Sequence, residues 1–411
     1  MNNHHHSIYN KEGDTLRILK SLSTKLEEYD KSQTRSKIFV LPDFFVDRII
    51  EVTNESLFFR DMKRKIVAGG GSMRGYISKD IKGGNAVNVA YCLAKLGLII
   101  ELCTVSDFVG STILKSVFSS FGKNVKLQVV KGKHGLSSVF EFAFSADSSI
   151  VSPDLPSPSC PPIDPQSNTP PATAIKPSFA NIMISDVGDN DNFGPELIET
   201  QETLKKLKVA QAVIFTNWAS NYRGTDLMKF VFSKSPQSIH FIDPADFELR
   251  SFEFVNTLKN NSDLIDILSI NENEYNHIVK ALKDISSKKD GQNLWYSYNT
   301  DDLLDNLNNF CTTAEFIYNY LGIRLCIHTT KGSILADNRC VTFVSALTPP
   351  EINIVSGAGD SWDAGFIFGE LAGFTSEEKL AFANLLAMLH IENFGGDDPS
   401  LEQVIGYLKK L

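Results

Sequence analysis

The stretch GAGDSWDAGF, residues 357–366, places three small residues directly before Asp360. It follows VTFVSALTPPEINIV, which is typical of a strand and a turn. It leads into SWDAGFIFGELAGF, whose apolar residues Phe366, Phe368 and Leu371 recur at roughly helical spacing. The glycines therefore stand at the start of a predicted helix.

The start of a helix favours anions, because the N–H groups of its first turn lack intrahelical partners and the helix dipole is positive there. Glycine also lets the backbone approach a ligand closely. We therefore interpret the amides of Gly357, Ala358 and Gly359 as an anion hole. Asp360 would be a general base that takes the proton of a hydroxyl group attacking phosphorus. A helix cap by Asp360 is the structural alternative.

Composition limits the classes of protein that fit. A length of 411 residues with 42 % hydrophobic residues fits one large α/β domain with appendages, or two domains. The net charge of −9 and the lack of clustered basic residues argue against a nucleic-acid partner. We expect a cytoplasmic protein without a membrane partner, because no apolar run resembles a signal peptide or a membrane span.

The six cysteines include no C-x-x-C pair, and most lie in apolar helix or strand patterns. We interpret them as reduced core thiols. They are Cys92, Cys103, Cys160, Cys311, Cys326 and Cys340.

Predicted strands and helices alternate along most of the chain, which favours a mainly parallel sheet covered by helices on both faces. Helices are expected over NAVNVAYCLAKLG and STILKSVFSSF, and further helical stretches separate the later strands. The predicted strands are KIFVL, IIELCTV, AVIFT, IHFID, LIDILSI and RLCIHTT.

Three segments depart from this alternation. Residues 13–36 carry leucines among charges, which predicts an amphipathic helix packed on the outside. Segments near 51–82 and 125–145 resemble β-ribbons without intervening helices, and they predict a small second sheet. Residues 146–178 hold nine of the sixteen prolines, which predicts a disordered or extended insertion.

A second glycine site lies in KGGNAVNVAYCLAKLG, where Gly84, Asn85 and Asn88 open a predicted helix. Their amide groups suit hydrogen bonds to sugar hydroxyls, although an ordinary Gly/Asn helix start has the same composition. No P-loop motif is present. The glycines of GGGSMRG, residues 69–75, are not followed by the apolar helix that a dinucleotide fingerprint requires.

Together, GGNAVNVAYCLAKLG (83–97) and GAGDSWDAGFI (357–367) resemble the two signatures of the PfkB, or ribokinase-like, carbohydrate kinases. The resemblance extends from about Lys37 to the C-terminus, so residues 1–36 are an N-terminal extension and 37–411 the kinase-like domain. It implies an α/β fold of the ribokinase-like three-layer α/β/α type. The central sheet would be mainly parallel, with a small β-sheet lid.

The resemblance also implies a role for each matching residue, with Mg²⁺ and ATP as cofactors. Asn271 and Glu274 of INENE would orient Mg²⁺ through water, although Asn followed by Glu at this spacing is also a helix-capping pattern. The implied catalytic residues are Asp360, Gly357, Ala358 and Gly359. The implied substrate contacts are Asp43, Asp47, Gly84, Asn85 and Asn88, and the implied nucleotide contacts are Thr330, Gly332 and Asn384.

The sequence departs from the family pattern at three positions. Ile354 stands where many members have an aspartate that is associated with a monovalent-cation site, which puts potassium activation in doubt. Pro42 and Asp107 replace glycines that are common in the family, and we expect them to change local turns more than chemistry.

The resulting hypothesis is a sugar kinase that transfers the terminal phosphoryl group of ATP to a hydroxyl of a sugar or sugar phosphate. One alternative is a nucleoside kinase of the same fold, whose base would contact Phe58, Phe59 and Phe140. The other is a non-catalytic sugar-binding regulator. Expected partners are a small-molecule acceptor and a nucleotide, and a homodimer is also considered.

Overall fold

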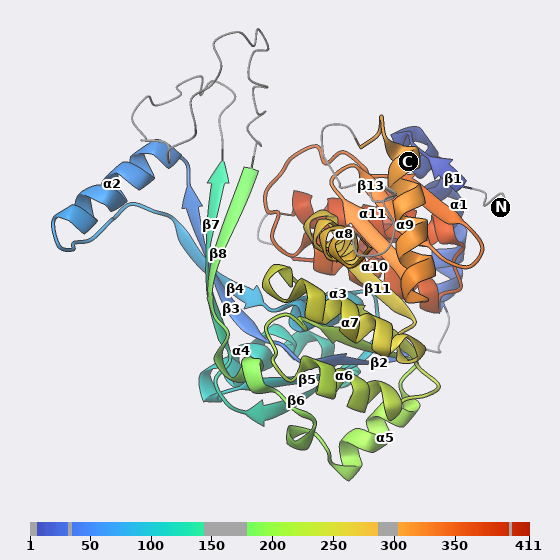
Figure 1. Ribbon diagram of the computed structural model, residues 1–411, viewed down its shortest axis with the longest axis horizontal. Coiled ribbons are helices and arrows are strands. Elements are labelled where there is room, and N and C mark those ends of the chain that lie inside the picture. The colour runs from blue at the N-terminus through green and yellow to red at the C-terminus, as the bar shows by residue number, and fades with distance from the viewer. Residues whose placement is uncertain (1–5, 32–34, 144–178, 287–302, 394–396) are drawn as a thin grey trace, which may run out of the picture. The chain divides into compact units, whose positions relative to one another are not determined.

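The computed structural model of the protein describes residues 6–31, 35–143, 179–286, 303–393 and 397–411 (Figure 1). The predicted insertion at 146–178 lies outside these residues. The chain forms two compact units. The larger comprises Met1–Val46, Lys82–Leu136 and Asp186–Leu411, and the smaller comprises Asp47–Ile81 and Ser137–Ser185.

A ten-stranded sheet runs through the larger unit, with the strand order β1-β14-β13-β12-β11-β10-β9-β2-β5-β6. All its neighbouring strands are parallel except β13, which is antiparallel to β12 and β14. The prediction of a mainly parallel sheet is therefore confirmed. The strands are β1 (His6–Tyr9), β2 (Lys37–Leu41), β5 (Ile99–Ser106), β6 (Val125–Lys131), β9 (Ala212–Thr216), β10 (Ile239–Asp243), β11 (Ile267–Asn271), β12 (Arg324–Thr329), β13 (Gly332–Ala336) and β14 (Val341–Ser345).

Helices cover both faces of this sheet, because successive side chains of a strand point to opposite sides. In β2, Ile38 and Val40 join one apolar core, whereas Phe39 and Leu41 join the other. The first core contains residues of α1 (Glu12–Lys31), α3 (Asn85–Lys95), α4 (Phe108–Val117), α10 (Ala358–Leu371), α11 (Ser376–Glu392) and α12 (Leu401–Leu408). The second contains residues of α5 (Gln201–Val209), α6 (Gly224–Ser233), α7 (Ser251–Asn260), α8 (Glu272–Ser286) and α9 (Leu307–Leu321).

The N-terminal segment is part of the larger unit, which differs from the predicted external extension. Strand β1 pairs in parallel with β14. Leu19, Leu22 and Leu26 of α1 are fully buried in the first core, because their spacing puts them on one stripe of the helix. Lys25 Nζ also pairs with Glu378 Oε1 at 2.7 Å.

The smaller unit contains a four-stranded sheet with the order β4-β3-β7-β8. Its strands are β3 (Phe45–Val52), β4 (Ser78–Gly83), β7 (Gly135–Ala143) and β8 (Phe179–Asp186). The second sheet was predicted, but two details differ. Helix α2 (Glu55–Val67) interrupts the ribbon near 51–82 (Figure 1), and β6 of the segment near 125–145 belongs to the large sheet.

Helix α2 forms because its ends carry the residues that helices prefer there. Asn54 caps its N-terminus, and its side chain accepts a hydrogen bond from the Leu57 amide at 2.8 Å. Arg64 and Lys65 lie in the last turn, next to the negative end of the helix dipole. Phe58 is buried and contacts the small unit's own aromatic cluster.

The described cysteines are free thiols, as predicted. Cys92, Cys103, Cys311 and Cys326 are buried and Cys340 is partly exposed, whereas Cys160 lies outside the described residues. No helix in the described part of the chain combines the length and apolar composition that a membrane crossing requires.

Candidate active site

Polar residues gather where the parallel strands of the larger unit end. Asp43 follows β2, Asp243 ends β10 and Asn271 ends β11. Helices α3 and α10, which carry the two glycine motifs, pack against each other. In open α/β sheets, ligands bind in the crevice outside the carboxyl ends of the strands. The two motifs are therefore at the edge of the sheet where chemistry is expected.

The turn before α10 presents backbone amides. Gly357 precedes the helix with φ of 88°, a conformation that favours glycine. The Ala358 amide donates to Val355 O at 3.2 Å. Among the described residues, no acceptor takes the amides of Gly357 and Gly359. Of the three amides predicted to form an anion hole, the tight turn therefore uses that of Ala358 itself, and the anion hole stays a prediction for Gly357 and Gly359.

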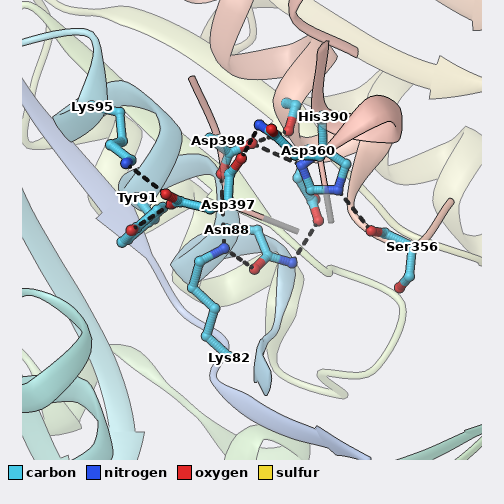
Figure 2. A network of polar contacts seen from close by, with 11 residues as sticks. Lys82, Asn88, Tyr91, Lys95, Ser356, Asp360, His390, Asp397 and Asp398 are labelled. Carbon is cyan, nitrogen blue, oxygen red and sulfur yellow. Dashed lines mark hydrogen bonds and ion pairs between the residues drawn. The ribbon is translucent and has the colours of Figure 1, made fainter. Parts of the chain in front are cut away.

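Asp360 lies in the first turn of α10 and is 9 % exposed. Its Oδ2 accepts a hydrogen bond from Asn88 Nδ2 at 2.8 Å. Lys82 Nζ in turn donates to Asn88 Oδ1 at 3.3 Å. Figure 2 shows this chain of contacts. Because Lys82 takes the amide oxygen, the Asn88 amide is oriented with its nitrogen toward Asp360.

Asp360 belongs to a cluster of buried carboxyl groups. Burial, and next the charge of Asp243, raises the pKa of Asp360 well above its usual range. Asp363, one turn later on α10, accepts from Ser269 Oγ at 2.5 Å. Burial and then Asp243 raise the pKa of Asp363 as well. Asp243 also has a raised pKa, mainly because of burial.

Sequence reasoning missed Asp243 and Asp363. Asp243 is the last residue of the apolar stretch IHFID, and a charged residue at the carboxyl end of a parallel strand is a recognisable signal. Asp363 stands three residues after Asp360, which places both on one face of the helix.

Asp43 organises the start of α3. Its carboxylate accepts from the backbone amides of Asn85 and Ala86 at 2.8 and 3.0 Å. It also accepts from Thr216 Oγ1 at 2.6 Å and from Asn217 Nδ2 at 3.2 Å. With 1 % of its surface exposed, Asp43 positions α3. Each of its oxygens already accepts two hydrogen bonds, and the predicted substrate contact of Asp43 stays a prediction.

Gly84 and Asn85 are part of the same helix start. Gly84 has φ of 89°, and a Cβ there would lie 3.0 Å from Asp43 Oδ2 and from Phe44 Cα. Only glycine fits this turn without a shift of the backbone. Asn85 Nδ2 donates to Asp243 Oδ2 at 2.8 Å, so the second motif reaches the carboxyl cluster directly.

Asp47 belongs to the smaller unit, where it lies on β3 and is buried. Its predicted contact with an acceptor hydroxyl stays a prediction. Phe58, Phe59 and Phe140 also belong to this unit. Phe58 packs edge-on against Phe59 with ring centroids 5.4 Å apart, and Phe140 lies 5.5 Å from Phe58.

Asn271 and Glu274 form a reciprocal cap at the start of α8. The backbone amide and Nδ2 of Asn271 donate to the two carboxylate oxygens of Glu274, each at 2.9 Å. Asn271 Oδ1 accepts from the Glu274 amide at 3.0 Å. This is the capping alternative that the sequence left open. Burial raises the pKa of Glu274 well above its usual range.

The capping geometry limits how these residues could serve magnesium. Both oxygens of Glu274 already accept hydrogen bonds, and no group of three or more His, Cys, Asp or Glu within the described ranges is arranged to hold a metal. Mg²⁺ binds oxygen and usually keeps several of its waters. Asn271 and Glu274 therefore fit an ion held through water, not one ligated directly.

The predicted nucleotide residues divide into two groups. Thr330 is exposed in the turn between β12 and β13. Gly332 follows with φ of 157°, and a Cβ there would lie 2.5 Å from Phe343 Cζ. Asn384 is held by contacts within the protein. Its Oδ1 accepts from Ser333 Oγ and Trp362 Nε1, each at 2.9 Å, and its Nδ2 donates to backbone carbonyls of β14.

Because its amide is fully used in this way, Asn384 ties α11 to α10 and to the sheet. It is 6 % exposed. These hydrogen bonds give Asn384 a structural role, and its predicted nucleotide contact stays a prediction. Its place on an all-round buried helix could be anticipated from the apolar composition of LAFANLLAML.

Two histidines at the site have no counterpart in the sequence predictions. His328, in β12, stacks on Trp362 with ring centroids 5.0 Å apart, and a Cβ on Gly359 would lie 3.2 Å from its Cε1. Burial lowers the pKa of His328 to about 4, so this ring is neutral at physiological pH. His390 lies behind Gly357 and contacts Asp398 and Ser356 (Figure 2).

The structure resembles solved structures of small-molecule kinases. A ribokinase of Arabidopsis thaliana, solved with ribose and ATP, superposes with a TM-score of 0.60 at 17 % identity over 92 % of this chain and 99 % of its own. An adenosine kinase of Sinorhizobium meliloti superposes with a TM-score of 0.61 at 16 % sequence identity, over 92 % of this chain and 99 % of the kinase. A nucleoside kinase of Burkholderia thailandensis, solved in complex with inosine, superposes with a TM-score of 0.55 at 12 % sequence identity, over 91 % of this chain and 98 % of the kinase.

The protein has the ribokinase-like fold. No protein-family model matches its sequence, and no curated protein matches it either. The likeness therefore concerns the fold, and it confirms the predicted three-layer α/β/α arrangement with a second, smaller sheet. Within this ribokinase-like fold, the two glycine motifs lie at the N-termini of α3 and α10.

Proposed function

We propose that the protein is a kinase that transfers the terminal phosphoryl group of ATP to a hydroxyl of a sugar or sugar phosphate. The observation that carries this proposal is the start of α10. There, two backbone amides without a described protein acceptor stand next to Asp360, a buried carboxyl group whose pKa is raised. An anion site and a proton acceptor side by side are what phosphoryl transfer to a hydroxyl needs.

In the proposed reaction, Asp360 accepts the proton of the acceptor hydroxyl. That oxygen forms a bond to the terminal phosphorus as the bond from phosphorus to the bridging oxygen of the nucleotide breaks, which leaves ADP. The amides of Gly357 and Gly359 stabilise the charge on the transferred group. Asn88 holds Asp360 in place through its 2.8 Å hydrogen bond.

Magnesium would supply positive charge at the phosphates when it is bound with the nucleotide. The carboxyl groups of Asp243, Asp360 and Asp363 repel one another, as their raised pKa values indicate. A cation nearby would relieve this repulsion and favour the ionised form of Asp360. Asn271 and Glu274 would hold the water shell of the ion.

The aromatic residues of the smaller unit favour a sugar over a nucleoside. Phe58 is 5 % exposed, and its ring contacts Phe59, Tyr76, Phe140 and Phe142. Phe59 stacks on Phe142 at 5.8 Å. Phe58 and Phe142 belong to the core of the unit, and Tyr76 and Phe140 pack against it. These rings are engaged with one another, whereas Phe59 is 46 % exposed. A nucleoside acceptor nevertheless remains the second candidate, since two of the similar structures are an adenosine kinase and a nucleoside kinase.

A panel of acceptors tests the proposal. The full-length protein is incubated with Mg²⁺ and ATP and with pentoses, hexoses, hexose phosphates or nucleosides, and both ADP and the phosphorylated product are measured. Reactions without acceptor report simple hydrolysis, and the Asp360→Asn variant is the matched control. We expect acceptor-dependent ADP formation with a sugar or sugar phosphate. Sugar binding by calorimetry without any turnover would instead identify a non-catalytic regulator.

A further inference from the structure

His390 lies in α11, directly behind the turn that precedes α10. Its Nε2 is 2.9 Å from the carbonyl oxygen of Ser356, and its Nδ1 is 2.9 Å from Oδ1 of Asp398. A Cβ built on Gly357 would lie only 3.1 Å from Nε2. The ring is 4 % exposed, and Asp398 is 2 % exposed. Figure 2 shows the imidazole between these two partners.

The partners of the ring decide its protonation. A backbone carbonyl oxygen only accepts, so Nε2 must donate. Asp398 also accepts a hydrogen bond from Ser361 Oγ at 2.5 Å. Lys82 Nζ lies 3.8 Å from Oδ2 of Asp398, and this cation favours the ionised carboxylate although burial opposes ionisation. Asp398 is therefore an ionised acceptor, Nδ1 must donate as well, and an imidazole that donates from both nitrogens is a cation.

The charged groups on neighbouring elements are consistent with a cation at this place. They are Asp398 before α12, Lys82 on β4 and Asp360 on α10. Lys82 Nζ is 3.8 Å from Asp398 Oδ2, so Asp398 lies between two cations. Helix α3 presents the uncharged amide of Asn88 toward the turn, 3.9 Å from a Cβ built on Gly357.

The hydrogen bond to Ser356 has a geometric consequence for the anion site. In a planar trans peptide, the carbonyl of one residue and the N–H of the next point in opposite directions. Because the Ser356 carbonyl is directed at His390, the Gly357 N–H is directed away from it. A hydrogen bond from a cation to that carbonyl also polarises the peptide and strengthens its N–H as a donor.

We propose that His390 is a positioning residue. Asp398 stabilises it as an imidazolium, and the imidazolium holds the Ser356–Gly357 peptide so that the Gly357 N–H faces the anion site. The expected effect of His390 on the rate rests on the proposed phosphoryl transfer. Its protonation and its contact with the Ser356 carbonyl do not depend on that proposal. The imidazolium gives this turn a positive charge that belongs to the protein.

The first experiment measures protonation directly and needs no enzyme activity. The full-length protein is labelled with ¹⁵N-histidine, and the His390 signal is assigned by its absence in His390→Gln. We expect protons on both ring nitrogens at neutral pH, detected as one-bond couplings between each nitrogen and its proton. These couplings should persist in buffer free of potassium. A ring protonated on one nitrogen would overturn the proposal, whatever the protein's activity.

The second experiment uses His390→Ala, which leaves the Ser356 carbonyl and the Asp398 carboxylate facing a space of ring size. Two such oxygens are ligands that K⁺ accepts in place of water. We expect kcat to fall on the order of 10²-fold, the cost of one oxyanion donor, with little change in the acceptor KM. KCl should restore part of the loss, whereas tetramethylammonium chloride at equal ionic strength should not. Turnover of the wild-type protein should be the same with either salt.

His240→Ala is the matched control. His240 is also a buried histidine, with Nδ1 2.8 Å from Leu264 O and Nε2 3.0 Å from Ser235 O, and it lies outside the turn. We expect it to lower the melting temperature without a potassium-dependent loss of kcat. If both alanine variants lose activity equally and neither responds to potassium, His390 is only a packing residue. If the wild-type protein binds ATP but never transfers its phosphoryl group, the function proposal fails while the NMR result still decides the state of His390.

Discussion

Asn88 and Asp360 lie 272 residues apart in the sequence, yet Asn88 Nδ2 donates to Asp360 Oδ2 at 2.8 Å. This hydrogen bond joins the first turn of α10 to α3, the two helices that carry the glycine motifs. It favours the ionised form of Asp360 and therefore opposes the effect of burial. A contact between the two motifs thus partly offsets the effect of burial on the charge state of the proposed base.

Asp360→Asn tests the base directly. Asparagine keeps the size of the side chain and its ability to cap a helix, but it cannot accept the proton. We expect kcat to fall by about 10²- to 10⁴-fold, with circular dichroism and nucleotide binding unchanged. Near-normal turnover would contradict the mechanism and return Asp360 to a capping role.

Asn88→Ala tests the hydrogen bond through the pH dependence of kcat/KM. Asp360 must be ionised to accept a proton, so the rate falls toward acid as Asp360 is protonated. Burial has already raised the pKa of Asp360, and losing the Asn88 hydrogen bond removes an effect that lowers it. We therefore expect the acidic limb to move to higher pH. An unmoved limb would mean that another group controls it.

Asp243→Asn should move the same limb in the opposite direction. The negative charge of Asp243 raises the pKa of Asp360, second only to burial. Its removal lowers that pKa, so ionised Asp360 persists to lower pH. Opposite shifts in Asn88→Ala and Asp243→Asn would identify the titrating group, because a general loss of stability has no reason to change sign between them.

Glu274→Gln separates magnesium orientation from helix capping. Glutamine retains one of the two oxygens that accept hydrogen bonds from Asn271. We therefore expect a modest loss of stability, about 1 kcal/mol. If Glu274 holds the water shell of the ion, the magnesium concentration for half-maximal rate should rise. Glu378→Gln changes the capping box of α11 and also removes the charge that pairs with Lys25, so it serves as the control for the magnesium dependence and not for the size of the stability loss. An unchanged magnesium curve in both variants would leave Glu274 with the cap alone.

Leu22→Ala tests whether the N-terminal helix belongs to the larger unit. Leu22 is fully buried in the first core, and a buried Leu→Ala change costs about 2–5 kcal/mol. Urea denaturation should show this loss, while Lys20→Ala, at an exposed position of the same helix, should stay within about 0.5 kcal/mol. A cost for Leu22→Ala as small as that of the control would mean that α1 is an appendage.

Local patterns predicted some elements well and others poorly. The strands KIFVL, AVIFT and IHFID were predicted because each is a short apolar run, and each is a strand of the large sheet. Helix α2 was missed because its apolar residues are few and lie between two strand-like segments, so its capping by Asn54 and its charged ends were the only local signs. The N-terminal helix was recognised, but its burial was not, since a leucine stripe does not reveal which surface covers it.

By itself, the sequence determined the alternation of strands and helices, the two glycine turns at helix starts and the place of Asp360 behind one of them. These features depend on hydrogen bonds and side-chain spacing within a few residues. Only the tertiary structure decided that Asp43 positions α3, that Asn384 joins α11 to α10 and the sheet, and that Asp243, Asp363 and His390 lie near Asp360 or the turn before it. The physical reason is that such contacts form between residues that the order of strands in the sheet brings together. A local pattern of residues does not specify that order.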